Sequence, residues 1–233
     1  MAVLSFTWNG VSSTTKHIRL QSRTPIIIPE ERVEHVTIPG RDGELTLTEG
    51  NDVRNSYFQN LSLIIDDPQY IGEAERWLTG EGWITFNDTE PNIKQRARFM
   101  GAVTFTKHSH NLSYYTAEAQ VYCEPAKRST TETDITVTSS GASITNPGNK
   151  AAKPLLAITG SGAVSITIGG NTLVIPECES GWVADCENQW ILDNGVPQMN
   201  AWTGAFPVIP TGTSTIAFTG SITKIVITPQ WRY

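Results

Sequence analysis

Cysteine is scarce in this sequence. Its 233 residues include three cysteines, Cys123, Cys178 and Cys186. Three thiols cannot all pair, and no two of them form a Cys-x-x-Cys unit, so we do not expect a disulfide scaffold. The short spacing between Cys178 and Cys186 leaves a disulfide across a hairpin open, but three ordinary free thiols are the preferred interpretation.

An excess of basic residues and long apolar runs are also lacking. The 17 basic and 23 acidic residues give a net charge of −6 and are interspersed along the chain. A protein that grips nucleic acid needs concentrated Lys and Arg to hold phosphates, so specific nucleic-acid binding is not expected. No stretch approaches the roughly 20 apolar residues of a membrane span. The N-terminus lacks both the basic and the apolar region of a signal peptide, which favours synthesis in the cytoplasm without membrane insertion.

The first half of the chain contains alternating apolar residues, which predict β-strands. Leu61, Leu63 and Ile65 share one face of such a strand. Two longer alternating stretches, at residues 97–105 and 115–123, predict an antiparallel pair. We therefore expect a sheet as the main element of this half.

A hairpin and one helix are expected within the same half. Residues 36–47 predict the hairpin, which turns at Gly40-Arg41-Asp42-Gly43, because an Asp-Gly pair tolerates the positive φ of tight turns. The helix is expected to begin at Asp66 or Asp67 and to end at Gly80.

The composition changes near Arg128. Most charged residues lie at or before this position, and the remainder is rich in Thr, Gly and Ile. Many short alternating stretches in this part predict short strands, with Gly160-Ser161-Gly162 as a turn. We therefore expect a mainly β protein of two domains: residues 1–128, sandwich-like with one helix, and residues 129–233, a second β-sandwich or jelly roll.

No arrangement of residues supports catalysis, a cofactor or a metal ion. Ser221 and Lys224 match a Ser-x-x-Lys pattern, but that acylation chemistry needs a helix, and their surroundings are typical of a strand. His108 and His110 form a His-x-His pair in a polar loop with no third zinc ligand nearby. The acidic residues between 177 and 187 lack the order of a calcium loop. We predict no catalytic residue, no cofactor and no metal site.

Several short motifs occur in an order that resembles a known family. The order runs from Phe6-x-Trp8-Asn9-Gly10 through Pro25–Pro29 to Ile38-Pro39-Gly40-Arg41-Asp42-Gly43, and ends with Gly204-x-Phe206-Pro207, Pro210-x-Gly212, Phe218-Thr219-Gly220 and Pro229-x-Trp231-Arg232-Tyr233. Together these motifs resemble the distal tail proteins of long, non-contractile-tailed bacteriophages over nearly the whole chain.

The resemblance implies a non-enzymatic virion protein that forms a homohexameric ring at the tail tip. In that family the N-terminal domain builds the ring around a channel for DNA, and the C-terminal domain is a galectin-like β-sandwich on the outside. The implied partners are further copies of the chain, the tail tube protein, a tail-tip protein and receptor-binding proteins. A closed ring needs two different complementary patches on each subunit, and a DNA channel is suited by a chain without a basic surplus.

The segment from Pro39 to Asn55 is expected to contact neighbouring subunits or the tail tube, because a polar hairpin there would project from the ring-forming domain. An ordinary exposed hairpin is the alternative. The residues proposed for this role are Pro39, Gly40, Arg41, Asp42, Gly43 and Asn55.

Two other functions remain open. A carbohydrate-binding β-sandwich that contributes to host adsorption would need exposed tryptophans, for which Trp182 and Trp202 are the candidates. For these two, and for Trp190 and Trp231, a place in the core or an interface is the preferred interpretation. A hydrolase of cell-wall polymers would need two carboxylates in a cleft at a suitable separation.

Overall fold

The computed structural model describes residues 4–48, 53–88, 92–107 and 114–233. The chain divides into two compact units, Met1–Lys127 and Arg128–Tyr233, and each is described by itself. Antiparallel strands dominate both units, and the described residues contain one α-helix. The expected mainly β class with one helix is therefore confirmed. Among the described residues, no helix has the length and hydropathy to span a bilayer.

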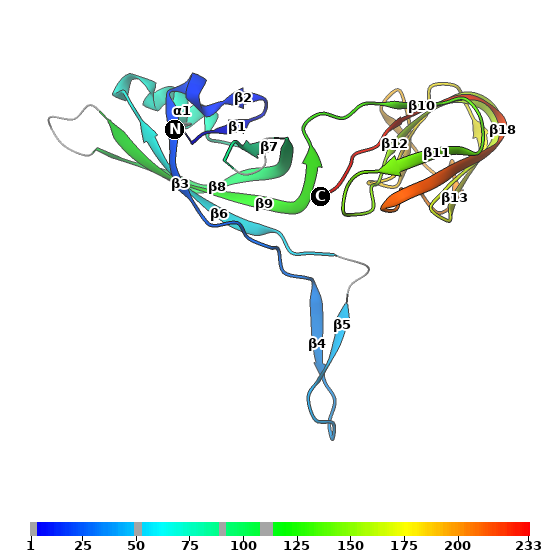
Figure 1. Ribbon diagram of the computed structural model, residues 1–233, viewed down its shortest axis with the longest axis horizontal. Coiled ribbons are helices and arrows are strands. Elements are labelled where there is room, and N and C mark those ends of the chain that lie inside the picture. Colours follow the sequence, from blue (N-terminus) through cyan, green and yellow to red (C-terminus); the bar gives the residue numbers. More distant parts are fainter. Residues whose placement is uncertain (1–3, 49–52, 89–91, 108–113) are drawn as a thin grey trace. The chain divides into compact units, whose positions relative to one another are not determined.

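A seven-stranded sheet forms the body of the first unit (Figure 1). Its spatial order is β2-β1-β7-β8-β9-β6-β3. The strands are β1 (Phe6–Trp8), β2 (Val11–Ser12), β3 (Ile18–Arg23), β6 (Tyr57–Ile65), β7 (Glu81–Phe86), β8 (Ile93–Lys107) and β9 (Tyr115–Ser129), and a 3₁₀ turn, η1 (Ser13–Lys16), links β2 to β3.

One face of this sheet is buried beneath the helix. Leu61, Leu63 and Ile65 of β6 have no exposed surface, as their alternation predicted. The α-helix, α1 (Ile71–Trp77), packs on the same core, where the Trp77 ring stacks on the Phe6 ring at 5.4 Å between centroids. Burial of such rings contributes both apolar area and stacking energy.

The helical region begins where the sequence predicted, but only part of it is α-helical. The Asp67 side chain accepts a hydrogen bond from the Gln69 N–H at 2.9 Å, and Pro68 opens a 3₁₀ turn, η2 (Pro68–Tyr70). The α-helix then starts at Ile71 and ends at Trp77. The proline and the tight first turn thus shorten the α-helix that the spacing predicted.

A two-stranded hairpin extends from the β3–β6 pair of the first unit (Figure 1). Its strands are β4 (Val33–Thr37) and β5 (Glu44–Thr48), so the expected hairpin is confirmed. Backbone hydrogen bonds from Thr24 to Asn60 and from Arg32 to Val53 continue the β3–β6 ladder toward it. We call β4, β5 and the loop between them the arm.

The secondary-structure elements of the second unit are all strands. Two of them, β12 (Leu155–Ile168) and β18 (Gly212–Thr228), are long and pair with each other over most of their length. The others are β10 (Ile135–Val137), β11 (Ala142–Asn146), β13 (Asn171–Cys178), β14 (Val183–Asp185), β15 (Trp190–Asp193), β16 (Val196–Gln198) and β17 (Thr203–Gly204).

The two long strands bend, and each pairs with other strands at both ends of the unit. The start of β12 pairs with β14 and its second half with β13, whereas β18 pairs with β11 at its start and with β10 near its end. Register shifts accompany the bend. The predicted turn at Gly160-Ser161-Gly162 is wrong, because these residues are the bulged part of β12. The expectation of only short strands in this part is likewise wrong for residues 212–228, which form one long bent strand, β18.

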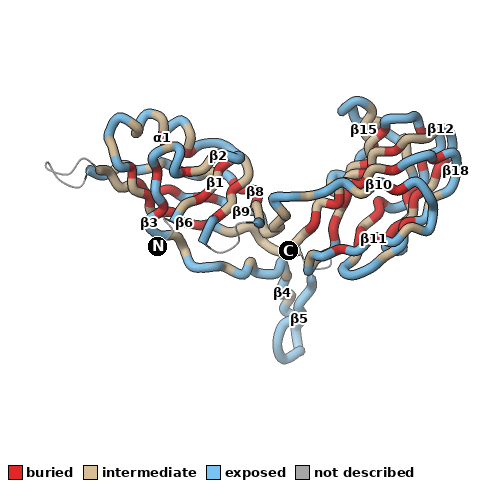
Figure 2. Tube along the Cα trace, turned by 45° about the horizontal axis from the view of Figure 1, so that its top comes forward, coloured by how far each residue is buried: buried red, intermediate tan, exposed pale blue. Residues whose placement is uncertain are grey.

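Each unit has its own hydrophobic core. Figure 2 shows that the strands of each unit contain buried residues, coloured red, in alternation with less buried ones. In the second unit the core includes Leu156, Ile166 and Ile225, none of which has more than a trace of exposed surface. The alternation that predicted these strands therefore also identifies the side that packs.

Candidate interaction surfaces

The tip of the arm is a solvent-exposed loop with two left-handed glycines. Gly40 has φ +83° and Gly43 φ +78°, while Asp42 is not among the residues with positive φ. The Arg41 N–H donates to the Ile38 carbonyl at 3.2 Å and closes the first part of the loop. Pro39, Arg41 and Asp42 are all exposed. The glycines, rather than the Asp-Gly pair as a unit, therefore supply the conformation that the turn needs.

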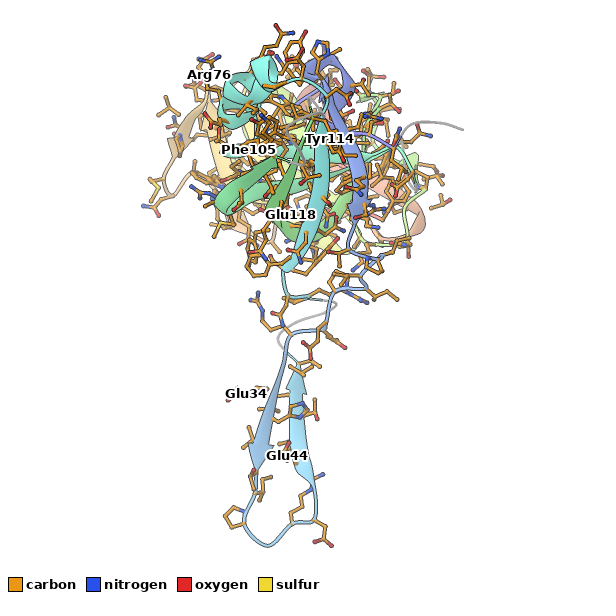
Figure 3. All side chains as sticks on the ribbon, turned by 90° about the vertical axis from the view of Figure 1, so that its left-hand side faces the viewer. Glu34, Glu44, Arg76, Phe105, Tyr114 and Glu118 are labelled. Atoms are coloured by element: carbon orange, nitrogen blue, oxygen red, sulfur yellow. The ribbon has the colours of Figure 1, made fainter. Side chains whose placement is uncertain are left out.

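One face of the arm is largely apolar and uncovered by the unit that carries it. Val36 lies opposite Leu45, and Glu34 lies opposite Leu47. Residues two apart in a strand share a face, so Val36, Leu45 and Leu47 lie together with Glu34. Leu47 is 46% exposed, and no residue of the arm is buried. Figure 3 shows Glu34 and Glu44 on this projecting hairpin.

Asn55 lies at the base of the arm and not at its tip. Its N–H donates to the Glu30 carbonyl at 2.8 Å, and its side-chain oxygen accepts from Arg32 Nε at 3.2 Å. The Arg54 guanidinium donates to the Pro29 carbonyl nearby at 3.1 Å. The structure therefore separates Asn55 from the loop at Pro39–Gly43, and gives it contacts that hold the base of the hairpin together.

The opposite, open face of the seven-stranded sheet has a polar region around Arg19, Ser62 and Glu118. Arg19 pairs with Asp66, and the Ser62 hydroxyl donates to the Glu118 carboxylate at 2.8 Å. These residues border a shallow hollow of about 500 Å³ over β3, β6 and β9. Glu118 is labelled on this part of the sheet in Figure 3. The lining holds one basic residue, Arg19, and two acidic ones, Asp66 and Glu118, so the hollow presents no concentrated positive charge.

The three cysteines are free thiols buried in the two cores. Burial raises the pKa of Cys123 to about 12, and an Arg23 guanidinium opposes this only weakly. Burial, with a smaller contribution from the Asp185 carboxylate, raises the pKa of Cys186 to about 12. Burial also raises the pKa of Cys178. A nucleophilic or metal-binding thiol needs a lowered pKa, so these three behave as small apolar side chains.

The motifs that imitate reactive sites have structural roles. Ser221 and Lys224 lie in β18 and not in a helix, so the Ser-x-x-Lys pattern lacks the helical setting that its acylation chemistry needs. The Asp185 carboxylate accepts the N–H groups of Glu187 and Asn188, both at 2.9 Å, and so closes a turn. Within residues 4–48, 53–88, 92–107 and 114–233, no group of three His, Cys, Asp or Glu side chains is placed to hold a metal ion. The His108 and His110 pair lies outside the described residues.

The two tryptophans considered for sugar contact differ in burial. Trp182 is 9% exposed and belongs to the core of the second unit. Trp202 is half-buried and packs edge-on against Phe206, with ring centroids 4.6 Å apart. Phe206 is itself buried, so it fixes the position of the Trp202 ring.

A further tryptophan, Trp190, is more exposed than Trp182 and Trp202. The sequence did not single it out as a candidate for sugar contact. It is 43% exposed, and it alternates in β15 with the fully buried Ile191. This alternation is the signal that could have placed it on the outer face. Trp190 and Trp202 line one surface hollow of about 410 Å³ in the second unit. The remaining lining residues are Asn188, Gln189, Pro197, Gln198, Met199 and Asn200.

The fold resembles that of a solved phage protein. The chain superposes on the Dit protein of phage SPP1 with a TM-score of 0.72 and 17% identical residues, over 100% of both chains. That protein is described as a paradigm of the hub adsorption apparatus in phages that infect Gram-positive bacteria. The resemblance to distal tail proteins that the motif order indicated is thereby confirmed at the level of the fold.

A second similarity is weaker. A chain of the phage p2 baseplate, in its activated conformation with Sr, gives a TM-score of 0.47 with 8% identity, over 99% of this chain and 100% of that one. A score this low does not establish a common fold. No protein-family model matches the sequence, and no curated protein does either.

Proposed function

We propose that this protein is a structural component of a phage tail, assembled as a six-membered ring where the tail tube meets the tail tip. The proposal is supported above all by the likeness to SPP1 Dit, which covers 100% of both chains and so includes both units. The partners are further copies of the chain, the tube protein, a tail-tip protein and receptor-binding proteins. Its location is the virion, after synthesis in the host cytoplasm, and it carries no catalytic function.

The two compact units act as separate domains in this proposal. Residues 1–128 build the ring around a channel for DNA, and residues 129–233 form an outer, galectin-like sandwich. A net charge of −6 suits a channel that DNA must leave as easily as it enters, because basic linings bind phosphates by releasing counterions. Heterologous contacts around a closed ring require each subunit to present two different patches.

The arm supplies one of these patches. A two-stranded hairpin is marginally stable on its own in water, and this one leaves Val36 and Leu45 only half-buried and Leu47 exposed on a single face. Burying such a face against a neighbouring subunit or the tube would stabilise both partners. The exposed tip from Pro39 to Gly43 makes the outermost contact, while Asn55 keeps the base in place.

Imaging and mass measurement test the assembly. The purified full-length chain at high concentration should give a native mass of six subunits and ring-shaped particles with a central opening in negative-stain images. Because assembly can require neighbouring tail proteins, gold-labelled antibodies should also decorate one end of purified virion tails. A chain that stays monomeric at all concentrations, together with virions that never bind the antibody, would exclude the proposal.

A further inference from the structure

We propose that the hollow between Trp190 and Trp202 in the second unit binds a neutral saccharide. We call the eight residues that line it, given above, the tryptophan hollow. The inference does not depend on ring assembly, because all of its lining residues belong to one unit of one chain. Its volume of about 410 Å³ lies in the usual range of small-molecule sites, about 300–1,000 Å³.

The two indole rings provide the apolar part of the site. Trp190 leaves 43% of its surface exposed, an unusual amount for so large an apolar side chain. Trp202 is half-buried and held edge-on by the buried Phe206 ring. A flat aromatic face matches the C–H face of a pyranose ring, and a ring already fixed in place loses little conformational entropy on binding.

Amide side chains provide the polar part. Asn188, Gln189, Gln198 and Asn200 all line the hollow. An amide offers two donor hydrogens and an accepting oxygen on neighbouring atoms, which suits a ligand whose hydroxyls both donate and accept. The side-chain amides of Gln189 and Asn200 make no hydrogen bond with any described residue.

The backbone holds two of these amides in an uncommon conformation. Gln189 has φ +59° and Asn200 φ +60°, in the left-handed region that costs an ordinary residue about 1–2 kcal/mol. The turn before Gln189 is held by the Asp185 carboxylate, which also accepts from Asn188 Nδ2 at 2.8 Å. Residues kept in such conformations concentrate at binding sites, and glycine would fill both positions more easily.

The side chains that line the tryptophan hollow carry no charge, and this restricts the class of ligand that the hollow can bind. None of the eight lining residues is Asp, Glu, Lys, Arg or His. Phosphate-bearing polymers and nucleic acids need positive charge for tight binding, and a cationic ligand would need a carboxylate. Aromatic faces combined with neutral amides fit an uncharged, polyhydroxylated ligand, such as an oligosaccharide of hexoses or N-acetylhexosamines.

Binding to immobilised glycans tests the inference with three variants of the full-length chain. Trp190→Ala removes the more exposed ring. Gln189→Gly with Asn200→Gly removes two amides and retains the left-handed backbone, so this double variant folds without strain. Val196→Ala is the matched control, because Val196 is 61% exposed on the neighbouring strand and does not line the hollow. Thermal unfolding of each variant verifies that the second unit is intact.

We expect the unaltered chain to bind neutral oligosaccharides on an array of hexose and N-acetylhexosamine glycans. Trp190→Ala and the double glycine variant should each lose at least tenfold in affinity, and Val196→Ala should not change it. The inference is overturned if no neutral glycan binds, if Trp190→Ala binds as tightly as the unaltered chain, or if only phosphate-bearing cell-wall polymers bind. The hollow would instead be a protein interface if the chain bound no glycan but did bind another tail protein, and if Trp190→Ala abolished that binding.

Discussion

The carbonyl oxygen of Ala163 occupies the space that a side chain on Gly220 would need. A Cβ atom on Gly220 would lie 2.2 Å from this oxygen and 3.0 Å from Val164 Cα. Gly220 also has φ +92°. The close approach lies where β12 and β18 change register and bend. The second unit can turn its two longest strands at this point because one of the two facing residues has no side chain.

Replacing Gly220 by alanine should strongly destabilise the second unit. We expect a loss of about 3 kcal/mol or more, because backbone strain and a steric clash with backbone atoms act together. Gly162→Ala is the matched control, since Gly162 has φ +73° in the same bend but open space around it. That variant should lose about 1–2 kcal/mol from strain alone. Equal losses in urea unfolding of the two variants would contradict the role of the close approach.

Changing Leu47 on the arm to aspartate should leave folding intact and prevent assembly. Leu47 is 46% exposed, so the free energy of unfolding of the single chain should change by no more than about 0.5 kcal/mol. Thr46→Asp is the control on the opposite face of the same strand. Under the proposed function, Leu47→Asp lowers the fraction of rings in mass photometry at least tenfold, and Thr46→Asp has a smaller effect. Rings that form equally well with both variants would remove the arm from the interface.

The strands and the hairpin were predictable from the sequence because each depends on local alternation. Leu61, Leu63 and Ile65 mark a buried face whatever the strand pairs with, and the glycines of the arm loop mark a turn. The bend in β12 was not predictable in the same way. Gly160 and Gly162 have the composition of a turn, and only the distant strand β18 beside them keeps the chain extended through the bulge.

Gln95 should be costly to replace by a residue that cannot form hydrogen bonds. It is 6% exposed; its amide lies 3.0 Å from the Tyr57 hydroxyl and also donates to the Glu124 carbonyl. Gln95→Leu has a similar volume but removes the hydrogen bonds to both partners, which should cost about 1–3 kcal/mol. Adding Tyr57→Phe should recover part of the loss, because replacing both partners is less costly than replacing one. Additive losses in a double-mutant cycle would show that the pair is not coupled.

The sequence did not predict the roles of buried polar residues such as Gln95 or of exposed aromatic residues such as Trp190. Gln95 shares the parity of the buried Ala97, so the pattern predicts its side but gives no sign of a polar partner. The tryptophan hollow joins residues from a turn, from β15 and β16, and from the loop before β17. Local spacing does not indicate that these segments meet, since their meeting depends on how the sheet folds.

Alkaline pH should destabilise the protein through its buried thiols. The pKa of Cys123 and of Cys186 is about 12 in the folded chain, against an ordinary value of 9.0. The unfolded chain therefore loses these protons first, so the stabilisation is complete below pH 9 and is lost progressively as the pH rises toward 12. The free energy of unfolding, measured by urea denaturation across this range, should fall with pH.

Substituting these two cysteines separates the thiol contribution from that of other groups. The double variant Cys123→Ala and Cys186→Ala should be less stable at neutral pH, because it leaves small cavities, but its stability should fall less steeply above pH 9. In the unaltered protein at neutral pH, a thiol reagent should react with the cysteines only after unfolding. A slope unchanged by the double substitution would assign the alkaline effect to other groups.

Because β12 and β18 run through both ends of the second unit, they affect how that unit unfolds. Leu155 pairs with Thr228 and Ile168 with Ile216, so one ladder joins segments far apart in the chain. Opening either end disturbs strands that the other end shares, which favours a single cooperative transition over piecemeal fraying. Distant pairing also slows the search for the native state. Once formed, a unit built in this way resists partial melting, which under the proposed function suits a part that must survive outside a cell.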